Sequence, residues 1–201
     1  MISRDISLMN LKTSRGRPRL PGTDSAILSA AYHLLEEDGY GGFSMEAVAR
    51  RAGAGKATLY RRWNSGADLL FDALARQTAF IIPLPNTGKL ELDLRQLLRA
   101  SFKLLNTRTA KLLRSLMAEA QIDEGFKARF RDTFVFSRRA GVRSILEAAV
   151  NRGELPTHVD REILIDAIYG VIWYRLLIEH APLDNKCVEQ ILQLVVNQRQ
   201  R

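Results

Sequence analysis

The sequence predicts an all-α protein of about nine helices, with a small N-terminal domain and a larger C-terminal domain. Apolar residues recur along most of the chain with the three- and four-residue spacing of amphipathic helices. No segment alternates apolar and polar residues for long enough to predict a strand. The Pro- and Gly-containing segment 83–88 is the clearest linker. We therefore expect a flexible basic arm at 1–20, a three-helix domain at 21–66 with a linking helix at 65–82, and a C-terminal domain at 83–201.

The composition is that of a globular protein. Apolar residues make up 46% of the 201 residues and charged residues 26%, a balance that argues against a disordered chain. No stretch reaches the roughly 18 uninterrupted apolar residues of a membrane helix. The N-terminus has no apolar h-region, and the single Cys187 cannot form an internal disulfide. We therefore expect a protein of the cytoplasm that does not associate with a membrane.

The positive charge is concentrated near the N-terminus. Thirty Lys and Arg against 22 Asp and Glu give a formal charge of +8. Residues 1–63 carry ten cations and six anions, and residues 64–201 carry twenty and sixteen, so each part holds a net +4. The cations of the first part cluster at Lys12, Arg15, Arg17 and Arg19 and again at Arg50, Arg51, Lys56, Arg61 and Arg62. This clustering predicts a polyanionic partner, and a merely solubilising surface is the alternative.

The N-terminal domain begins with a helix at Thr23, which Gly39 ends. Ser44 is a plausible N-cap for a short second helix at 44–52. A Gly-Ala-Gly turn then leads into a third helix at 56–63. A fourth helix starts at Ser65 and is stopped by Pro83. Five more helices are expected at about 90–105, 109–122, 125–150, 159–179 and 185–197.

The second and third helices have the proportions of a DNA-binding helix-turn-helix. If Leu59 faces inward, Trp63 lies about 40° away on the same side, because each residue turns the helix by about 100°. The opposite side then carries side chains suited to a major groove, in which Arg61 reaches phosphate or guanine and small Ala57 touches a thymine methyl. An exposed polar face on a structural helix is the alternative interpretation. The residues expected to contact DNA are Ser44, Lys56, Ala57, Thr58, Tyr60, Arg61 and Arg62.

Residues 23–70 resemble the N-terminal domain of the tetracycline-repressor (TetR) family of bacterial transcription regulators. The matching run is ILSAAYHLLEEDGYGGFSMEAVARRAGAGKATLYRRWNSGADLL, in which Ala-Gly-x-x-Lys-x-Thr-Leu-Tyr-x-x-Trp is the most specific part. The resemblance implies that this domain binds operator DNA as a dimer, and that divergent C-terminal helices dimerise and bind a small-molecule inducer. It also implies that Lys56, Thr58, Tyr60 and Arg61 contact DNA, and that Leu59 and Trp63 belong to the core.

Two positions depart from the family pattern. Gly55 stands where the family often has a capping Ser or Thr, and Gly66 where a Lys commonly contacts phosphate. The missing cation would lower the salt dependence of DNA binding by about one phosphate contact. The basic arm is a possible substitute, since Arg15, Arg17 and Arg19 form an extended Arg-Gly-Arg-Pro-Arg segment similar to an AT-hook core that enters a narrow minor groove. A solvated basic tail explains the same residues equally well.

The helix expected at 159–179 is apolar on nearly every side, so it must be buried on nearly every side. One face could pack on the core of its own chain and another on a second subunit, together with the last helix. Burial at the centre of a monomer is the alternative. The residues expected at the dimer interface are Ile165, Ile168, Tyr169, Ile172, Val188, Ile191, Leu192 and Val195.

A ligand pocket is expected among the aromatic residues of the C-terminal domain. Aromatic side chains at helical spacing belong more often to a core than to a binding site, but their number favours an apolar or aromatic inducer. The candidate ligand-binding residues are Phe102, Gln121, Phe126, Phe130, Phe134, Trp173 and Tyr174.

No catalytic motif accompanies these features. His33, His158 and His180 share no ligand spacing with Cys or carboxylates, and the sequence lacks nucleotide-binding loops and nucleophile elbows. We therefore expect no metal, no cofactor and no enzyme activity. The expected function is a homodimeric transcriptional repressor that binds an inverted-repeat operator in double-stranded DNA and is released by a small molecule. A non-specific architectural DNA-binding protein and a ligand-binding dimer with a weakened DNA head are the alternatives.

Overall fold

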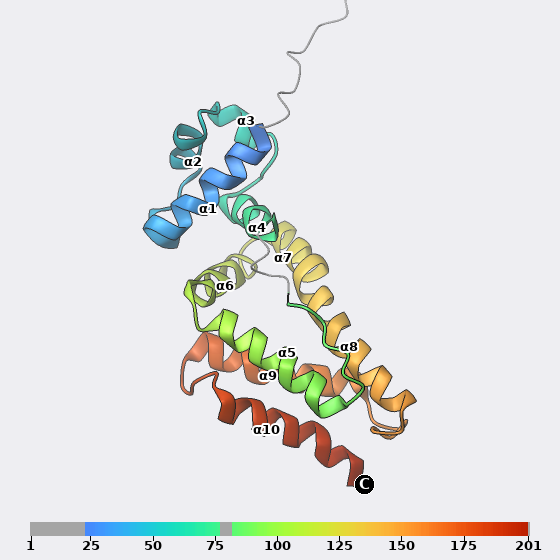
Figure 1. Ribbon diagram of the computed structural model, residues 1–201. Coiled ribbons are helices and arrows are strands. Elements are labelled where there is room, and N and C mark those ends of the chain that lie inside the picture. Colours follow the sequence, from blue (N-terminus) through green and yellow to red (C-terminus); the bar gives the residue numbers. More distant parts are fainter. Residues whose placement is uncertain (1–22, 77–81, 201) are drawn as a thin grey trace, which may run out of the picture.

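The computed structural model describes residues 23–76 and 82–200, and every regular element within them is helical (Figure 1). The all-α prediction is therefore confirmed for these residues. The basic arm predicted at 1–20, with Arg15, Arg17 and Arg19, lies outside them. No helix of the described part is long and apolar enough to span a bilayer.

The N-terminal unit consists of α1 (Thr23–Gly42), α2 (Met45–Ala52) and α3 (Lys56–Tyr60). Gly39 interrupts α1 with a positive φ of 68°, as the sequence predicts, and one further turn follows it. Ser44 caps α2 by accepting a hydrogen bond from the backbone N–H of Ala47 (3.1 Å). Gly53 ends α2 in the left-handed conformation, which a residue without Cβ adopts at little cost. Residues 61 and 62 form a turn, so α3 is shorter than predicted.

Helix α4 (Gly66–Arg76) joins the two hydrophobic cores of the described chain. Leu69 and Ala73 are buried in the cluster formed by α1, α2 and α3. Leu70, Phe71 and Leu74 on the other side of α4 are buried in the larger C-terminal cluster. A displacement of α4 must therefore be felt in both cores, because close-packed interiors transmit strain.

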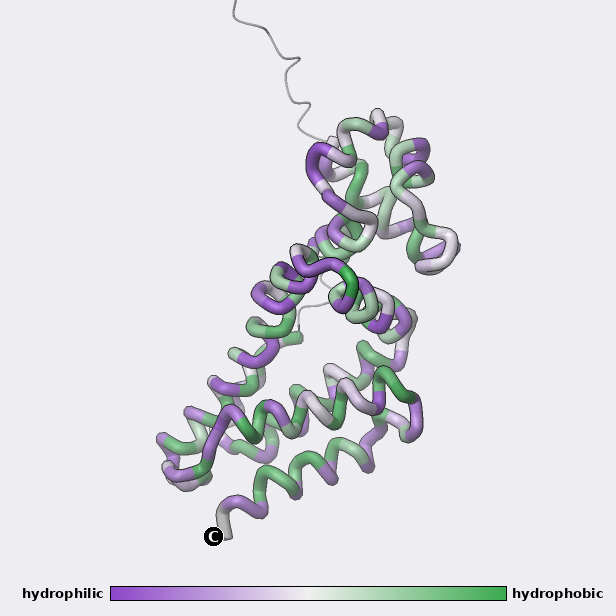
Figure 2. Tube along the Cα trace, turned by 180° about the vertical axis from the view of Figure 1, so that it is seen from behind, coloured by the Kyte–Doolittle hydropathy of each residue, from purple (hydrophilic) through white to green (hydrophobic). Residues whose placement is uncertain are grey.

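The C-terminal unit contains six further α-helices, which follow one another with short connections. They are α5 (Leu90–Leu105), α6 (Arg108–Glu119), α7 (Glu124–Phe130), α8 (Phe136–Asn151), α9 (Arg161–Ile178) and α10 (Asn185–Val196), with a short 3₁₀ turn η3 (Asn197–Gln200) at the end. Helix α5 packs against α8 and α10, and α8 packs against α9. Figure 2 shows hydrophobic residues recurring along these helices between hydrophilic ones, as in amphipathic helices.

The helix predicted at 125–150 is one continuous helical segment with an internal irregularity. A π-helical turn, η2 (Arg131–Val135), separates α7 from α8. Such a turn changes the direction of the side chains that follow it, and π-helical turns occur often at functional sites.

The dimer prediction needs correction at the level of residues. Ile165, Ile168 and Ile172 of α9 are at most 5% exposed within a single chain. The four predicted residues of α10 are also buried in the same core, namely Val188, Ile191, Leu192 and Val195. Tyr169 is half-buried and packs against that core. A helix that is apolar all round does not indicate which apolar side faces its own chain, and the prediction chose the inner side. The large apolar side chains left on the outside of α9 and α10 are Ile163, Tyr174, Leu177, Ile178 and Leu194.

Candidate DNA-binding surface and ligand cavity

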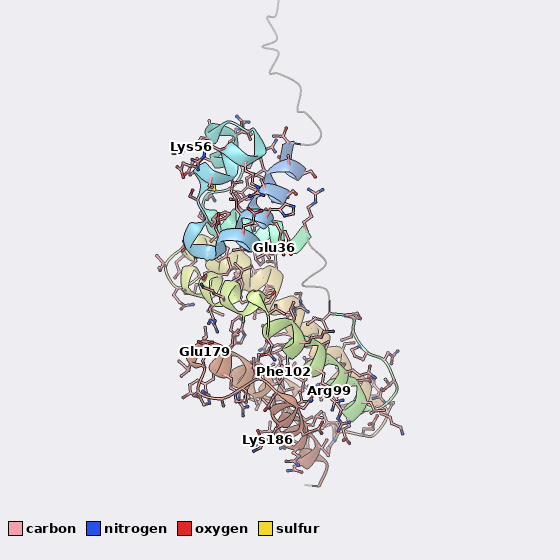
Figure 3. The ribbon with its side chains drawn as sticks, turned by 60° about the vertical axis from the view of Figure 1, so that its left-hand side comes forward. Glu36, Lys56, Arg99, Phe102, Glu179 and Lys186 are labelled. Atoms are coloured by element: carbon pink, nitrogen blue, oxygen red, sulfur yellow. The ribbon has the colours of Figure 1, made fainter. Side chains whose placement is uncertain are left out.

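Helix α3 presents the surface predicted for contact with DNA. Leu59 is fully buried and Trp63 is 6% exposed, so both face the core as the helical wheel requires. Figure 3 shows Lys56 at the outer end of the N-terminal unit, far from Lys186 on α10. The exposed residues of this segment are Lys56, Ala57, Tyr60 and Arg61, and Thr58 is half-buried.

Two of the predicted cations contact carboxylates of their own unit. The ammonium of Lys56 pairs with Glu46 of α2, and this hydrogen bond lowers the pKa of Glu46 and raises that of Lys56. The guanidinium of Arg62 contacts the carboxylate of Asp24 at the start of α1. A phosphate that takes up either cation must therefore compete with a carboxylate that is already in place.

Ser44 can cap α2 and contact DNA at the same time. Its hydroxyl oxygen accepts the hydrogen bond from Ala47, but a hydroxyl also has one O–H donor. The residue is exposed, so the donor can point toward a phosphate oxygen.

The two glycines that depart from the family pattern differ in their surroundings. Gly55 precedes α3 without a side-chain cap, and a Cβ there would meet only the Thr58 hydroxyl at 3.8 Å. A Cβ at Gly66 would lie 3.1 Å from the ring of Phe43, closer than most Cβ contacts. A lysine at position 66 would therefore require the Phe43 ring to move, which gives a physical reason for glycine at this position.

A chain of polar contacts ties the end of the α3 segment to α4 and α7. The indole Nε1 of Trp63 donates to the carboxylate of Asp72 (2.8 Å). Arg129 of α7 donates to the other carboxylate oxygen of Asp72 and to the carboxylate of Asp68 (2.8 Å). Asp68 is only 7% exposed, so Arg129 compensates a nearly buried charge.

An aromatic cluster continues from this contact into the C-terminal unit. The guanidinium of Arg129 lies 5.3 Å from the centre of the Phe71 ring. Phe71 contacts Phe126 and Phe130 with ring centres 6.0 and 5.7 Å apart, and Phe130 stacks on Phe134 at 5.1 Å. Phe134 lies within the π-helical turn η2.

Phe134 also lines a predominantly apolar cavity with a volume of about 360 Å³. The cavity is enclosed by α5, α6, η2, α8 and α9. Its apolar wall consists of Ile82, Leu104, Leu105, Leu113, Phe134, Val135, Ile172, Trp173 and Leu176. Its polar lining consists of Ser101, Arg138, Arg139, Asp166 and Tyr169.

Only two of the seven predicted ligand-binding residues line this cavity, namely Phe134 and Trp173. Phe102, Phe126 and Phe130 are 2–3% exposed and belong to the core. Gln121 is exposed after α6, and Tyr174 is 60% exposed with its ring 4.5 Å from that of His180. The ligand-binding prediction is corrected for these five residues, because aromatic spacing alone does not separate a cavity wall from a packed core.

Sequence reasoning missed Arg138, Arg139 and Asp166 and assigned Tyr169 to the dimer interface. The sequence contained one indication of this cavity wall, since Phe134 and Arg138 are four residues apart, as are Tyr169 and Trp173. Such pairs share one helix face. That the two faces meet across α8 and α9 follows only from the packing.

The polar side of the cavity combines a neutral donor with charged groups. Tyr169 donates its phenolic O–H to the backbone carbonyl of Arg138 (2.9 Å), and burial raises the pKa of Tyr169 to about 12. Arg139 pairs with Asp166 and with Glu162 (2.8 Å), and these hydrogen bonds raise its pKa. Burial lowers the pKa of Arg138.

Comparison with known proteins agrees with the sequence resemblance. Residues 27–73 match the family model "Bacterial regulatory proteins, tetR family", and residues 84–195 match "Tetracyclin repressor-like, C-terminal domain". The chain is 34% identical over 182 residues to the HTH-type transcriptional regulator YdeS of Bacillus subtilis (strain 168), covering 90% of this chain and 92% of that protein. It is 31% identical over 188 residues to the DNA-binding transcriptional repressor TetR of Mycobacteroides abscessus, covering 91% and 94%.

Solved structures share the whole architecture. The TetR family transcription regulator SCO0332 is 29% identical and superposes with a TM-score of 0.75, covering 88% of this chain and 98% of that one. The regulator FadR from Bacillus subtilis, solved in complex with stearoyl-CoA, has a TM-score of 0.66 at 17% identity and covers 87% and 98%. The second of these likenesses concerns the fold alone. Both family models match, and the identities extend along nearly the whole chain, which also carries the exposed helix α3. The chain therefore belongs to the TetR family of DNA-binding transcriptional regulators.

Proposed function

We propose that this protein is a homodimeric repressor that binds an inverted-repeat operator and is released from it when a small molecule enters the cavity of the C-terminal unit. One observation carries the proposal. The DNA-facing segment around α3 and the cavity are joined within one chain through Trp63, Asp72, Arg129 and the Phe71–Phe134 aromatic cluster. One relative is named a DNA-binding transcriptional repressor, which supports repression rather than activation.

The proposed DNA contacts are of two kinds: contacts that position the protein on the DNA and contacts that recognise the base sequence. Lys56, Tyr60 and the Ser44 hydroxyl would contact phosphates and set the orientation of α3. Thr58 and Arg61 would reach base edges in the major groove, and Ala57 would let the helix approach closely. Arg62 would add a phosphate contact if it leaves Asp24, and Arg15, Arg17 and Arg19 of the arm would follow the adjacent minor groove.

The proposed dimer uses the outer side of α9 together with α10. Ile163, Tyr174 and Ile178 are each at least 60% exposed within one chain, and Leu177 lies beside them at 42%. Their spacing along α9 places them on one stripe with Gly170, where a second helix could approach closely. Two copies of this stripe related by a two-fold axis would bury apolar area that a single chain exposes.

Release would operate through α4. A ligand that displaces Phe134 would move the stacked rings and Arg129, and Arg129 holds both Asp68 and Asp72 of α4. Because α4 is part of both cores, its movement would change the separation of the two α3 helices in the dimer. The ligand must bind this second arrangement more tightly, since equal affinity for both arrangements shifts nothing.

The test is recovery of DNA fragments from sheared genomic DNA of the source organism by the purified full-length protein at about 150 mM salt, where non-specific phosphate binding is weak. Recovery of a few fragments that share an inverted repeat, and their loss with the Thr58→Ala variant, is the expected result. Uniform recovery of all sequences, unchanged in that variant, would instead indicate an architectural DNA-binding protein and overturn the proposal.

A further inference from the structure

The hydroxyl groups that line the cavity are held by other groups of the same chain. The Ser101 hydroxyl donates to the backbone carbonyl of Leu97 (2.8 Å), one turn earlier in α5. The Tyr169 hydroxyl donates to the backbone carbonyl of Arg138 (2.9 Å) on α8. Both hydroxyl protons therefore have an acceptor in place, and a ligand that took one of them would have to replace a hydrogen bond already made.

The charged groups of the lining are engaged as well. Arg139 of α8 pairs with the carboxylates of Asp166 and Glu162, both on α9. Arg138 has interactions of its own within the chain, among them one with the Phe134 ring, whose centre lies 5.5 Å from the guanidinium carbon. Because each guanidinium has partners within the chain, neither of them requires an anionic ligand.

The Arg139–Asp166 pair lies at the open side of the cavity. Among the described lining residues, Asp166 and Gly170 are exposed, whereas the others are buried or half-buried. The side chain of Asp166 is 59% exposed, so water still reaches its carboxylate. At this entrance an anion meets the Asp166 carboxylate and a cation meets the Arg139 guanidinium, so neither sign of charge is favoured.

The remainder of the wall is apolar. Leu104 and Leu105 of α5 contribute to it, together with Leu113 of α6 and the rings of Phe134 and Trp173. The cavity of about 360 Å³ equals the volume of about a dozen liquid water molecules at ~30 Å³ each, which corresponds to a ligand of roughly a dozen nonhydrogen atoms. Apolar surface gains free energy by leaving water for such a wall, whereas an ion loses hydration that nothing in the wall replaces.

We propose that the ligand of this cavity is an uncharged, mainly apolar molecule of about that size, which buries its surface against Phe134, Trp173 and the leucines and forms no ion pair with the protein. The aromatic content of the sequence favours an apolar or aromatic inducer, and the engaged polar lining adds that a charged group on such a molecule is excluded. This inference rests on the proposed function for its regulatory meaning, but it concerns binding alone.

The experiment compares matched probes by isothermal titration calorimetry on the full-length protein. One set is 1-naphthylmethanol, 1-naphthoate and 1-naphthylmethylammonium, and the other is decanol, decanoate and decylammonium, each with about a dozen nonhydrogen atoms. At least one alcohol is expected to bind at one site per chain and at least ~10-fold more tightly than both ions of its set, because an ion would give up hydration without gaining a partner. The proposal is overturned if neither alcohol binds, or if an ion binds as tightly as its alcohol.

A cavity-filling variant locates the bound probe. Ser101→Phe places a ring in the cavity, and the hydroxyl it removes bonds only to a carbonyl of its own helix. This variant should weaken binding of the alcohol at least ~10-fold, in proportion to the lost space. Ser144→Phe adds the same ring to an exposed position of α8 outside the lining and should stay within about threefold of wild type. Circular dichroism verifies that both variants are folded, and equal alcohol binding by the two would overturn the proposal.

Asp166→Asn tests the charge argument without filling the cavity. The substitution removes the carboxylate at the entrance and releases one side of the Arg139 guanidinium. The carboxylate probe should therefore bind at least ~5-fold more tightly than to wild type, while the affinity of the alcohol stays within about threefold. Asp132→Asn opens an exposed pair with Arg131 outside the lining and should change neither affinity. An unchanged affinity of Asp166→Asn for the carboxylate would contradict the exclusion of anions and overturn the proposal.

Operator binding by the same wild-type preparation distinguishes this inference from the proposed function. Preference for the alcohol without any operator binding would refute the regulator proposal and leave the ligand class standing. Operator binding by a protein that prefers an ionic probe, or that binds none of the probes, would do the reverse.

Discussion

The carboxylate of Asp72 accepts hydrogen bonds from two different units of the chain. The indole of Trp63, directly after α3, donates from 2.8 Å, and Arg129 of α7 donates to the second oxygen. Asp72 is therefore the point where the core of the N-terminal unit meets the aromatic cluster that leads to the cavity.

Arg129→Met should lower the free energy of unfolding by about 2 kcal/mol, because it leaves the nearly buried Asp68 carboxylate without its guanidinium donor. Urea denaturation followed by circular dichroism measures this. Lys127→Met on the same helix removes an exposed pair with Glu124 and should stay within about 0.5 kcal/mol of wild type. Equal effects of the two substitutions would refute a structural role for the Arg129 contacts.

Lys56→Gln should weaken operator binding. It should also reduce the magnitude of the slope of log affinity against log salt by about one for each N-terminal unit of the dimer. Glu46→Gln should have the opposite effect and tighten binding by roughly threefold, because it removes the carboxylate that competes with phosphate for Lys56. Fluorescence anisotropy over a salt series checks both values. Lys186→Gln, at the far end of the molecule, serves as the control. Weaker binding by Glu46→Gln would contradict the competition.

Ile178→Glu should dissociate the dimer while helix content stays unchanged, because Ile178 is 60% exposed within one chain. Sedimentation velocity measures the oligomeric state. Ile122→Glu changes an equally apolar side chain that is 81% exposed after α6, and that variant should remain dimeric. Ile168→Glu should instead unfold the protein, since Ile168 is 1% exposed. A dimer that survives Ile178→Glu would exclude the proposed face.

Stability should fall between about pH 4.5 and pH 2, in part through Glu162. Hydrogen bonds from Arg143 and Arg139 lower the pKa of Glu162 from 4.5 to about 2. In this interval the unfolded chain binds a proton that the folded chain does not, so the stabilisation present above pH 4.5 is lost as the pH decreases. Denaturation midpoints measured across this range should decline less steeply for Glu162→Gln. Parallel curves for the two proteins would count against this assignment.

The sequence by itself determined the local structure of this protein and its family. Gly39, Ser44 and Gly53 set the ends of α1 and α2, because caps and positive φ angles depend on a few neighbouring residues. The burial of Leu59 and Trp63 followed from helical periodicity in the same way.

The tertiary structure decided which apolar side chains enclose a cavity, which form a core and which remain outside. Periodicity marks one side of a helix as apolar but does not say what packs against it, so Ile168 and Ile178 looked alike in the sequence and differ in burial. Arg138 drew no attention in a sequence with many arginines. It lines the cavity only because α8 packs on α9, and contacts between residues distant in the chain depend on packing that no local pattern encodes.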